Sequence, residues 1–134
     1  MLVLALSERE GPLMTGRIAE EEALPAAYLE QLMMTLRKAG LVTATRGQHG
    51  GYELARDPRD ISLAQIIEAL EGPLEIADCS DVPSCCRDPR ECALKEVFDE
   101  ANRALYEVFD KTSLAELAER QRAKQPARSP MYFI

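Results

Sequence analysis

The chain has 134 residues, 46% hydrophobic and 29% charged, a composition typical of a single soluble domain that buries a core. No apolar run reaches the roughly 20 residues of a membrane span, and the start MLVLALSEREG does not have the pattern of a secretory signal, so we expect a cytoplasmic protein with no membrane partner. A net charge of −7 excludes a uniformly basic nucleic-acid coat but not a local positive face, and 5% aromatic residues disfavour a stacking platform for single strands.

The first part of the chain predicts two short helices joined by a turn. Residues 1–7 are expected to be the end of a helix that begins upstream, because so short a helix is not stable alone. Thr15 is expected to cap the next helix, and Pro25 to begin a further one that Gly40 ends. Four apolar residues recur in this last helix at three- and four-residue spacing: Leu29, Leu32, Met33 and Leu36. The order is the outline of a helix-turn-helix.

A β-hairpin is expected directly after the second of these helices. The β-rich run 41–45 and the short run 52–54 flank a glycine-rich loop from Arg46 to Gly51. Such a hairpin is the wing of a winged helix. Residues 1–72 are therefore predicted to be a winged helix-turn-helix domain for DNA binding.

The rest of the chain predicts a cysteine-rich loop and a long helix. Ser62 and Gln65 match a capping box for a helix that Gly72 ends, and residues 73–90 are expected to be loop. Apolar residues then alternate four and three apart, which indicates a helix that pairs with a partner helix. They are Leu94, Phe98, Ala101, Leu105 and Val108.

The predicted fold class is therefore mainly α, with a small hairpin wing and a long carboxy-terminal dimerisation helix. Residues 91–120 are expected to hold this helix and a short final helix, which a capping box from Ser113 to Glu116 opens. The polar residues 121–134 are expected to be a mobile tail.

The second helix and the wing supply candidate DNA contacts. A helix of this length fits the major groove, where small Ala side chains allow close approach, Glu can accept from cytosine and Gln can bond adenine. Arg at the wing tip suits the minor groove, and basic residues at the end of the helix suit phosphates or simply the helix dipole. The alternative is that each of these is an ordinary exposed side chain, or, for Tyr28, partly a core one. The candidates are Ala27, Tyr28, Glu30, Gln31, Arg37, Lys38, Arg46 and His49.

All four cysteines lie close together, at Cys79, Cys85, Cys86 and Cys92. Scattered structural disulfides would not cluster in this way, so metal binding or redox sensing is indicated. Soft thiolates suit an iron–sulfur cluster, whereas the CxxC knuckles typical of structural zinc are missing. A zinc site and a thiol redox switch stay open as alternatives. No catalytic motif is present, so we do not expect an enzyme.

The string YLEQLMMTLRKAGLVTATRGQHGGYEL, with ISLAQIIEALEG, the cysteine loop and TSLAEL, resembles the Rrf-two family of bacterial winged-helix transcription regulators. That family includes iron–sulfur cluster regulators, nitric-oxide-sensing repressors and cofactor-free members. The resemblance covers about residues 1–120 and implies a homodimer, formed through the long helix, on a palindromic double-stranded operator. It also implies that Tyr28, Glu30 and Gln31 read the major groove and that Arg46 is the wing contact.

The resemblance further implies a cluster, 2Fe–2S or 4Fe–4S, held by Cys79, by Cys85 or Cys86, and by Cys92. In one branch of the family a His three residues after the last Cys completes the ligands, but Lys95 stands there in this chain. The fourth ligand therefore stays open between the second of the paired cysteines, an upstream residue and an external thiol. The hypothesis is a regulator that senses iron–sulfur, redox or nitric oxide status. The alternative is a cofactor-free or zinc- or thiol-redox regulator that acts through a protein partner.

Overall fold

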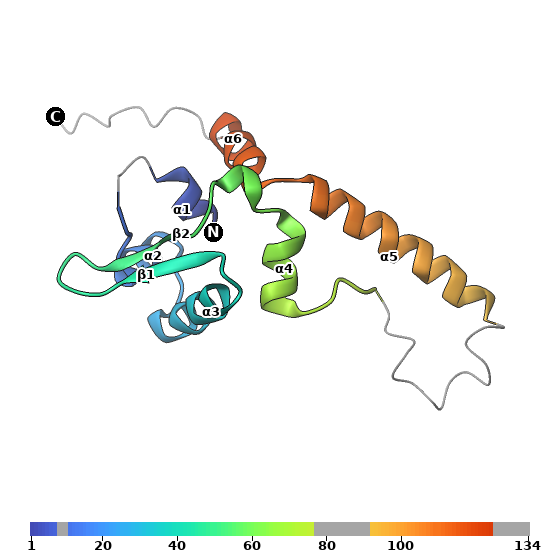
Figure 1. The fold of residues 1–134 in the computed structure, drawn as a ribbon, viewed down its shortest axis with the longest axis horizontal. Coiled ribbons are helices and arrows are strands. Elements are labelled where there is room, and N and C mark those ends of the chain that lie inside the picture. Colours follow the sequence, from blue (N-terminus) through green and yellow to red (C-terminus); the bar gives the residue numbers. More distant parts are fainter. Residues whose placement is uncertain (8–10, 77–91, 125–134) are drawn as a thin grey trace.

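The computed structural model describes residues 1–7, 11–76 and 92–124 (Figure 1). The helices in this part of the chain are α1 (Leu2–Leu6), α2 (Thr15–Glu21), α3 (Ala26–Lys38), the 3-10 helix η1 (Pro58–Asp60), α4 (Leu63–Glu71), α5 (Ala93–Lys111) and α6 (Leu114–Lys124). The strands are β1 (Val42–Thr45) and β2 (Gly51–Leu54). This is the expected mainly helical fold with a hairpin wing.

Helices α2 and α3 form the predicted helix-turn-helix, with small differences at their starts. The backbone N–H groups of Arg17 and Ile18 both donate to the carbonyl of Met14, at 3.1 and 3.2 Å, so Met14 is the N-cap. The prediction that Thr15 caps this helix was therefore wrong, because the hydrogen-bond ladder begins one residue earlier. Pro25 likewise lies at the N-cap of α3 instead of beginning the helix.

The turn between α2 and α3 holds Ala23 in a left-handed conformation, with φ of 53°. The N–H of Leu24 reaches back to the carbonyl of Ala19 at 2.9 Å, which closes the end of α2 around this residue. An L-residue with a Cβ pays roughly 1–2 kcal/mol for such a φ, and glycine does not.

An Ala23→Gly variant should therefore raise the free energy of unfolding by about 1 kcal/mol, measured by urea denaturation. Ala39→Gly is the matched control, since Ala39 closes α3 with φ of −76°, where glycine offers no relief. The control should be destabilised by about 0.5–1 kcal/mol. An equal loss in both variants would show that Ala23 is not strained.

The predicted wing is confirmed as an antiparallel hairpin in which Val42 pairs with Leu54 and Thr45 with Gly51. Leu13, in the segment before α2, forms an isolated antiparallel β-bridge with Tyr52 of this hairpin. Its N–H donates to the carbonyl of Tyr52 at 2.9 Å, and the N–H of Tyr52 donates to the carbonyl of Leu13 at 2.8 Å. The wing is thus fixed to the start of the helix-turn-helix.

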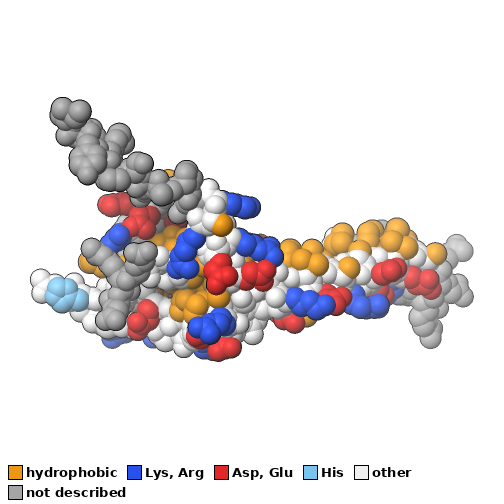
Figure 2. All heavy atoms as spheres, turned by 90° about the horizontal axis from the view of Figure 1, so that it is seen from above, with side chains coloured by type: hydrophobic (Ala, Val, Ile, Leu, Met, Phe, Trp, Pro, Cys, Tyr) orange, Lys and Arg blue, Asp and Glu red, His pale blue; other side chains and the backbone are white. Residues whose placement is uncertain are grey.

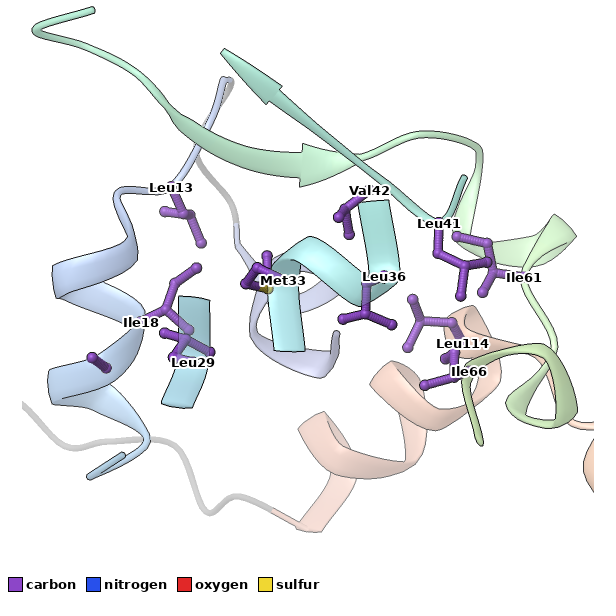
Figure 3. Close-up of a cluster of buried hydrophobic side chains, with 11 residues drawn as sticks. Leu13, Ile18, Leu29, Met33, Leu36, Leu41, Val42, Ile61, Ile66 and Leu114 are labelled. Atoms are coloured by element: carbon purple, nitrogen blue, oxygen red, sulfur yellow. The ribbon is translucent and has the colours of Figure 1, made fainter. Parts of the chain in front are cut away.

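One hydrophobic core joins the winged helix to α6 (Figure 3). From α3 it takes Leu29, Met33 and Leu36, which face the other elements along one side of that helix. The other members are Leu13, Ile18, Ala19, Leu41, Val42, Ile61, Ile66 and Leu114. Because α3 is packed on one side only, its opposite side is left to solvent.

The start of α4 is tied to the junction of α5 and α6. The predicted capping box is confirmed: Ser62 Oγ accepts from the N–H of Gln65, and the Gln65 side chain accepts from the N–H of Ser62. Beside it the N–H of Leu63 donates to the carbonyl of Thr112, and the N–H of Leu114 donates to that of Ile61, both at 2.8 Å. The base of the long helix is thereby held against the winged helix.

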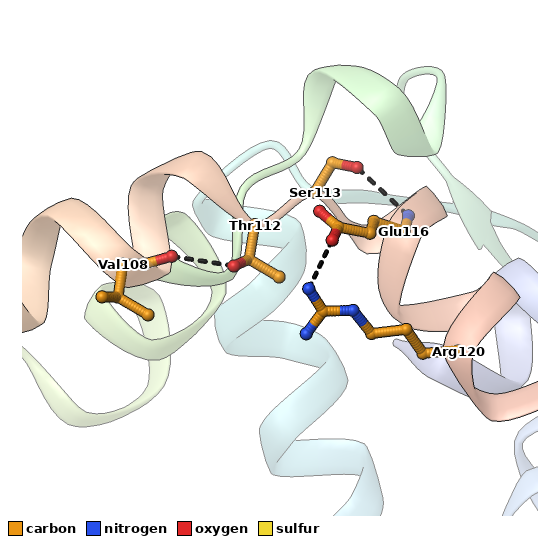
Figure 4. Close-up of polar contacts among 5 residues, drawn as sticks. All are labelled: Val108, Thr112, Ser113, Glu116 and Arg120. Atoms are coloured by element: carbon orange, nitrogen blue, oxygen red, sulfur yellow. Dashed lines mark hydrogen bonds and ion pairs between the residues drawn. The ribbon is translucent and has the colours of Figure 1, made fainter. Parts of the chain in front are cut away.

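Helix α5 forms a projection beside the winged helix, and α6, which follows it, packs on the winged helix (Figure 1). Ser113 Oγ accepts from the N–H of Glu116 at 3.1 Å, while the Glu116 carboxylate pairs with Arg120 (Figure 4). Arg122 donates to the carbonyl of Ala5 in α1 at 3.3 Å. Helix α6 accordingly continues to Lys124, four residues past the expected limit at residue 120, and the rest of the expected tail lies outside the described residues.

Candidate nucleic-acid interface

The solvent-facing side of α3 is the first part of the candidate interface. Since Leu29, Met33 and Leu36 are buried, a spacing of 3.6 residues per turn places Ala27, Gln31, Met34 and Lys38 along the opposite side. All four of these residues are exposed. Together they form a line on the helix that a DNA groove can approach.

The α3 candidates chosen from the sequence lie on this line or beside it, whereas Arg46 and His49 lie on the wing; all eight candidates are exposed. Tyr28 is 51% exposed, so it belongs mainly to the surface and not to the core. Glu30 and Arg37 flank the line on one side. Met34 lies on the line but was not selected from the sequence; the spacing from the apolar positions of the helix could have identified it.

The basic residues among the candidates form no ion pair with another described residue. Within the described part of the chain, Arg37, Lys38 and Arg46 have no carboxylate partner. Arg17, by contrast, pairs with Glu21 at 2.8 Å and Arg120 with Glu116. The unpaired cations are those that a phosphate can bind without breaking an existing interaction.

The wing tip carries Arg46 and His49, both exposed, and projects from the body (Figures 1 and 2). Two close approaches define its backbone. A Cβ on Gly50 would lie 2.3 Å from the carbonyl oxygen of Thr45, and one on Gly51 would lie 2.1 Å from that of Leu13. The tight loop therefore presents the two polar side chains at its end.

Of the four predicted cluster ligands only Cys92 lies within the described residues; Cys79, Cys85 and Cys86 lie outside them. Cys92 is half-buried and forms the N-cap of α5. No group of three metal-binding side chains occurs among residues 1–7, 11–76 and 92–124, so the described part does not by itself hold a metal site.

Helix α5 presents an apolar face to solvent and buries none of its described residues. Leu94, Val97 and Val108 are 60%, 59% and 60% exposed. Figure 2 shows the apolar side chains along one edge of the helix and charged ones along the other. On the charged side Lys111 donates to Glu107, and this hydrogen bond lowers the pKa of the Glu107 carboxyl.

None of the described helices has the length and apolar character that a membrane span requires.

The profile of the Rrf2 family, described as "Iron-dependent Transcriptional regulator", matches residues 1–120. The chain belongs to the Rrf2 family. The resemblance noted in the sequence is thereby confirmed.

The relatives of this Rrf2 chain are regulators of transcription. The HTH-type transcriptional regulator CymR of Bacillus subtilis is 38% identical over 134 residues, which cover 100% of this chain and 91% of CymR. The solved structure of CymR, the global cysteine regulator of B. subtilis, superposes on this chain with a TM-score of 0.74 at 37% identity. The match covers 89% of this chain and 87% of that one. T. potens IscR has the same TM-score at 38% identity, covering 98% and 87%.

These similarities confirm the predicted winged-helix fold and the prediction that the protein is not an enzyme. It is a DNA-binding transcriptional regulator of the Rrf2 family. The solved structures that it resembles include both a cysteine regulator and an IscR.

Proposed function

We propose that this regulator acts in the cytoplasm as a homodimer on a palindromic DNA operator, with α3 in the major groove and the wing beside it. The observation that carries the proposal is the exposed side of α3, where Arg37 and Lys38 have no partner among the described residues. Two such helices in a dimer fit half-sites about 34 Å apart, one turn of B-DNA. The apolar face of α5 supports pairing of two copies.

The proposed contacts divide into three groups by their chemistry. Arg37 and Lys38 bind phosphates, and Arg46 and His49 contact DNA from the wing. The major-groove readers are Ala27, Tyr28, Glu30 and Gln31, whose side chains can approach or hydrogen-bond base edges. Phosphate contacts should set affinity, and the base contacts should set the preferred sequence.

An Arg46→Ala variant should bind duplex DNA more weakly, and its affinity should depend less on salt. Loss of one phosphate or minor-groove cation per half-site lowers the slope of log affinity against log salt by about 1 per half-site. Fluorescence anisotropy over a series of KCl concentrations measures this slope. Arg103→Ala is the control, since Arg103 is exposed on α5; it should keep the parent slope. If both variants keep the parent slope, the wing is not part of the DNA interface.

We further propose that Cys79, Cys85 or Cys86, and Cys92 hold an iron–sulfur cluster of the 2Fe–2S or 4Fe–4S type. The position of Cys92 supports this, because it lies half-buried at the N-cap of α5, shortly after the other three cysteines in the sequence, and thiolates are the ligands that iron–sulfur clusters use. The family description as iron-dependent and the similarity to an IscR add support. When bound, such a cluster supplies a group that responds to oxidants, nitric oxide or iron supply.

The fold offers a route from the cysteines to the DNA-binding face. Cys92 is the N-cap of α5, and the N–H of Ile76, which precedes the cysteine segment, donates to Asn102 Oδ1 of this helix at 2.7 Å. The far end of α5 is bonded to the start of α4 through Leu63 and Thr112. A change in how Cys92 is held would therefore shift α5 relative to the winged helix, and with it the separation of two α3 helices in the dimer.

Protein purified without oxygen should contain iron and acid-labile sulfide near stoichiometry, with visible absorption from thiolate-to-iron charge transfer. A Cys92→Ser variant should lose most of this iron and absorption, because it lacks one thiolate ligand, yet keep its helical circular dichroism. Separate Cys85→Ser and Cys86→Ser variants identify which of the pair is a ligand. Operator affinity that does not change when the cluster is removed would refute the switch.

A second function is favoured by the similarity to CymR along the whole chain. In that case the regulator carries no cluster, and its cysteines act as redox-active thiols or zinc ligands while a protein partner supplies the signal. Colourless protein with zinc or no metal, and operator affinity sensitive to thiol oxidants, would support this function. The iron and sulfide content separates the two.

A further inference from the structure

We infer that Met34 is a specificity-determining residue that contacts a thymine methyl in the major groove. The inference rests on the proposed DNA binding through α3 and adds a base reader to the candidates chosen from the sequence. It starts from an apolar side chain in the middle of an otherwise polar surface.

Met34 is 53% exposed, although the neighbouring Met33 is 2% exposed and fills the core. Packing therefore does not require a large apolar side chain at position 34. Together with Arg37 and Lys38, Met34 lines a shallow hollow on the outside of α3. The hollow combines one apolar wall with two cations that have no partner among the described residues.

This combination matches the edge of a DNA groove. Phosphates line both sides of the major groove, and the thymine methyl is the apolar group that base pairs present within it. A methionine side chain is unbranched and polarizable, so it adapts to a small apolar partner. Arg37 and Lys38 would hold the backbone while Met34 reaches the methyl group.

The spacing along α3 predicts which bases are read together. Gln31 and Met34 are three residues apart, about 4.5 Å along the helix axis, which is close to the ~3.4 Å rise of one base pair. Gln31 can bond the adenine of one A·T pair, and Met34 would contact the thymine methyl group of the neighbouring pair. We therefore expect A·T pairs at two adjacent positions of each half-site.

The test is selection of bound sequences from a random double-stranded DNA library by the dimer, followed by thymine-to-uracil substitution in an enriched duplex. Uracil removes only the methyl group. The parent protein should lose about fourfold in affinity per half-site at one position. Met34→Ala should show no such loss and no thymine preference there, while Met34→Leu should restore both.

Met14→Ala is the control, since Met14 is 57% exposed but lies at the start of α2. It should keep the thymine preference and the sensitivity to uracil. The inference is overturned if Met34→Ala selects the same sequences as the parent and loses the same factor with uracil. If the parent enriches no sequence at all, the proposed operator binding fails, and the role of Met34 is overturned together with it.

Discussion

A Gly51→Ala variant should lose about 2–3 kcal/mol of unfolding free energy. The added Cβ would lie 2.1 Å from the carbonyl oxygen of Leu13 and 2.4 Å from its carbonyl carbon. Both atoms belong to backbone that pairs with Tyr52 in both directions, so they cannot move without breaking two hydrogen bonds. Urea denaturation followed by circular dichroism measures the loss.

Gly16→Ala is the matched control for this substitution. Gly16 lies within α2, and a Cβ there meets nothing within 4 Å. Alanine is the better helix former by about 1 kcal/mol, so the control should be slightly stabilised. If Gly51→Ala were as stable as this control, the contact between Leu13 and the wing would not be rigid. Gly51→Ala should also bind DNA more weakly than the parent, because the added Cβ displaces the wing from the start of α2.

Elements defined by neighbouring residues were predictable from the sequence. The Ser62 capping box needs only a partner three residues away, and it forms as expected. Gly40 follows α3 with φ of 71°, the left-handed conformation in which glycine ends a helix without strain. The hairpin likewise follows from two short β-rich runs around a glycine-rich loop.

Features that depend on distant residues could not be read in this way. The bonds between Leu13 and Tyr52, and between Leu63 and Thr112, join segments that no local pattern relates. The end of α6 is a similar case. Its last turn is polar and lacks an apolar repeat, but Arg122 reaches the carbonyl of Ala5 in α1 and so has a tertiary contact there.

For the candidate site, the sequence patterns predicted positions on the surface, and all eight candidates are exposed. Tyr28 and Arg46 are exposed as a DNA contact requires, yet exposure follows from the helical and hairpin patterns alone. Met34 was not among the candidates because a methionine in a helix usually belongs to the core, although the apolar spacing already assigns Met33 to the buried side, and the exposed fractions of 2% for Met33 and 53% for Met34 agree with that spacing. The contacts with DNA themselves remain the proposal that the variants above test.

Charges placed on the apolar face of α5 should have a large effect on dimerisation. A Val97→Glu, Val108→Glu double variant should be monomeric at concentrations where the parent is a dimer. The two valines are 59% and 60% exposed in the single chain, so the fold should tolerate the changes, but in a dimer four carboxylates would be buried without partners. Each such charge costs several kcal/mol, and ~4 kcal/mol already raises a dissociation constant by about 10³.

Analytical ultracentrifugation measures the dimer, and anisotropy with a palindromic duplex measures its effect on DNA. Arg103→Glu is the control, because it adds a carboxylate on the side of α5 opposite the valines and should leave the dimer intact. A monomer binds only one half-site, so operator affinity should fall steeply in the double variant while single half-site binding is kept. A double variant that still sediments as a dimer would place the interface on another surface, and would break the proposed link between Cys92, α5 and the spacing of the two α3 helices.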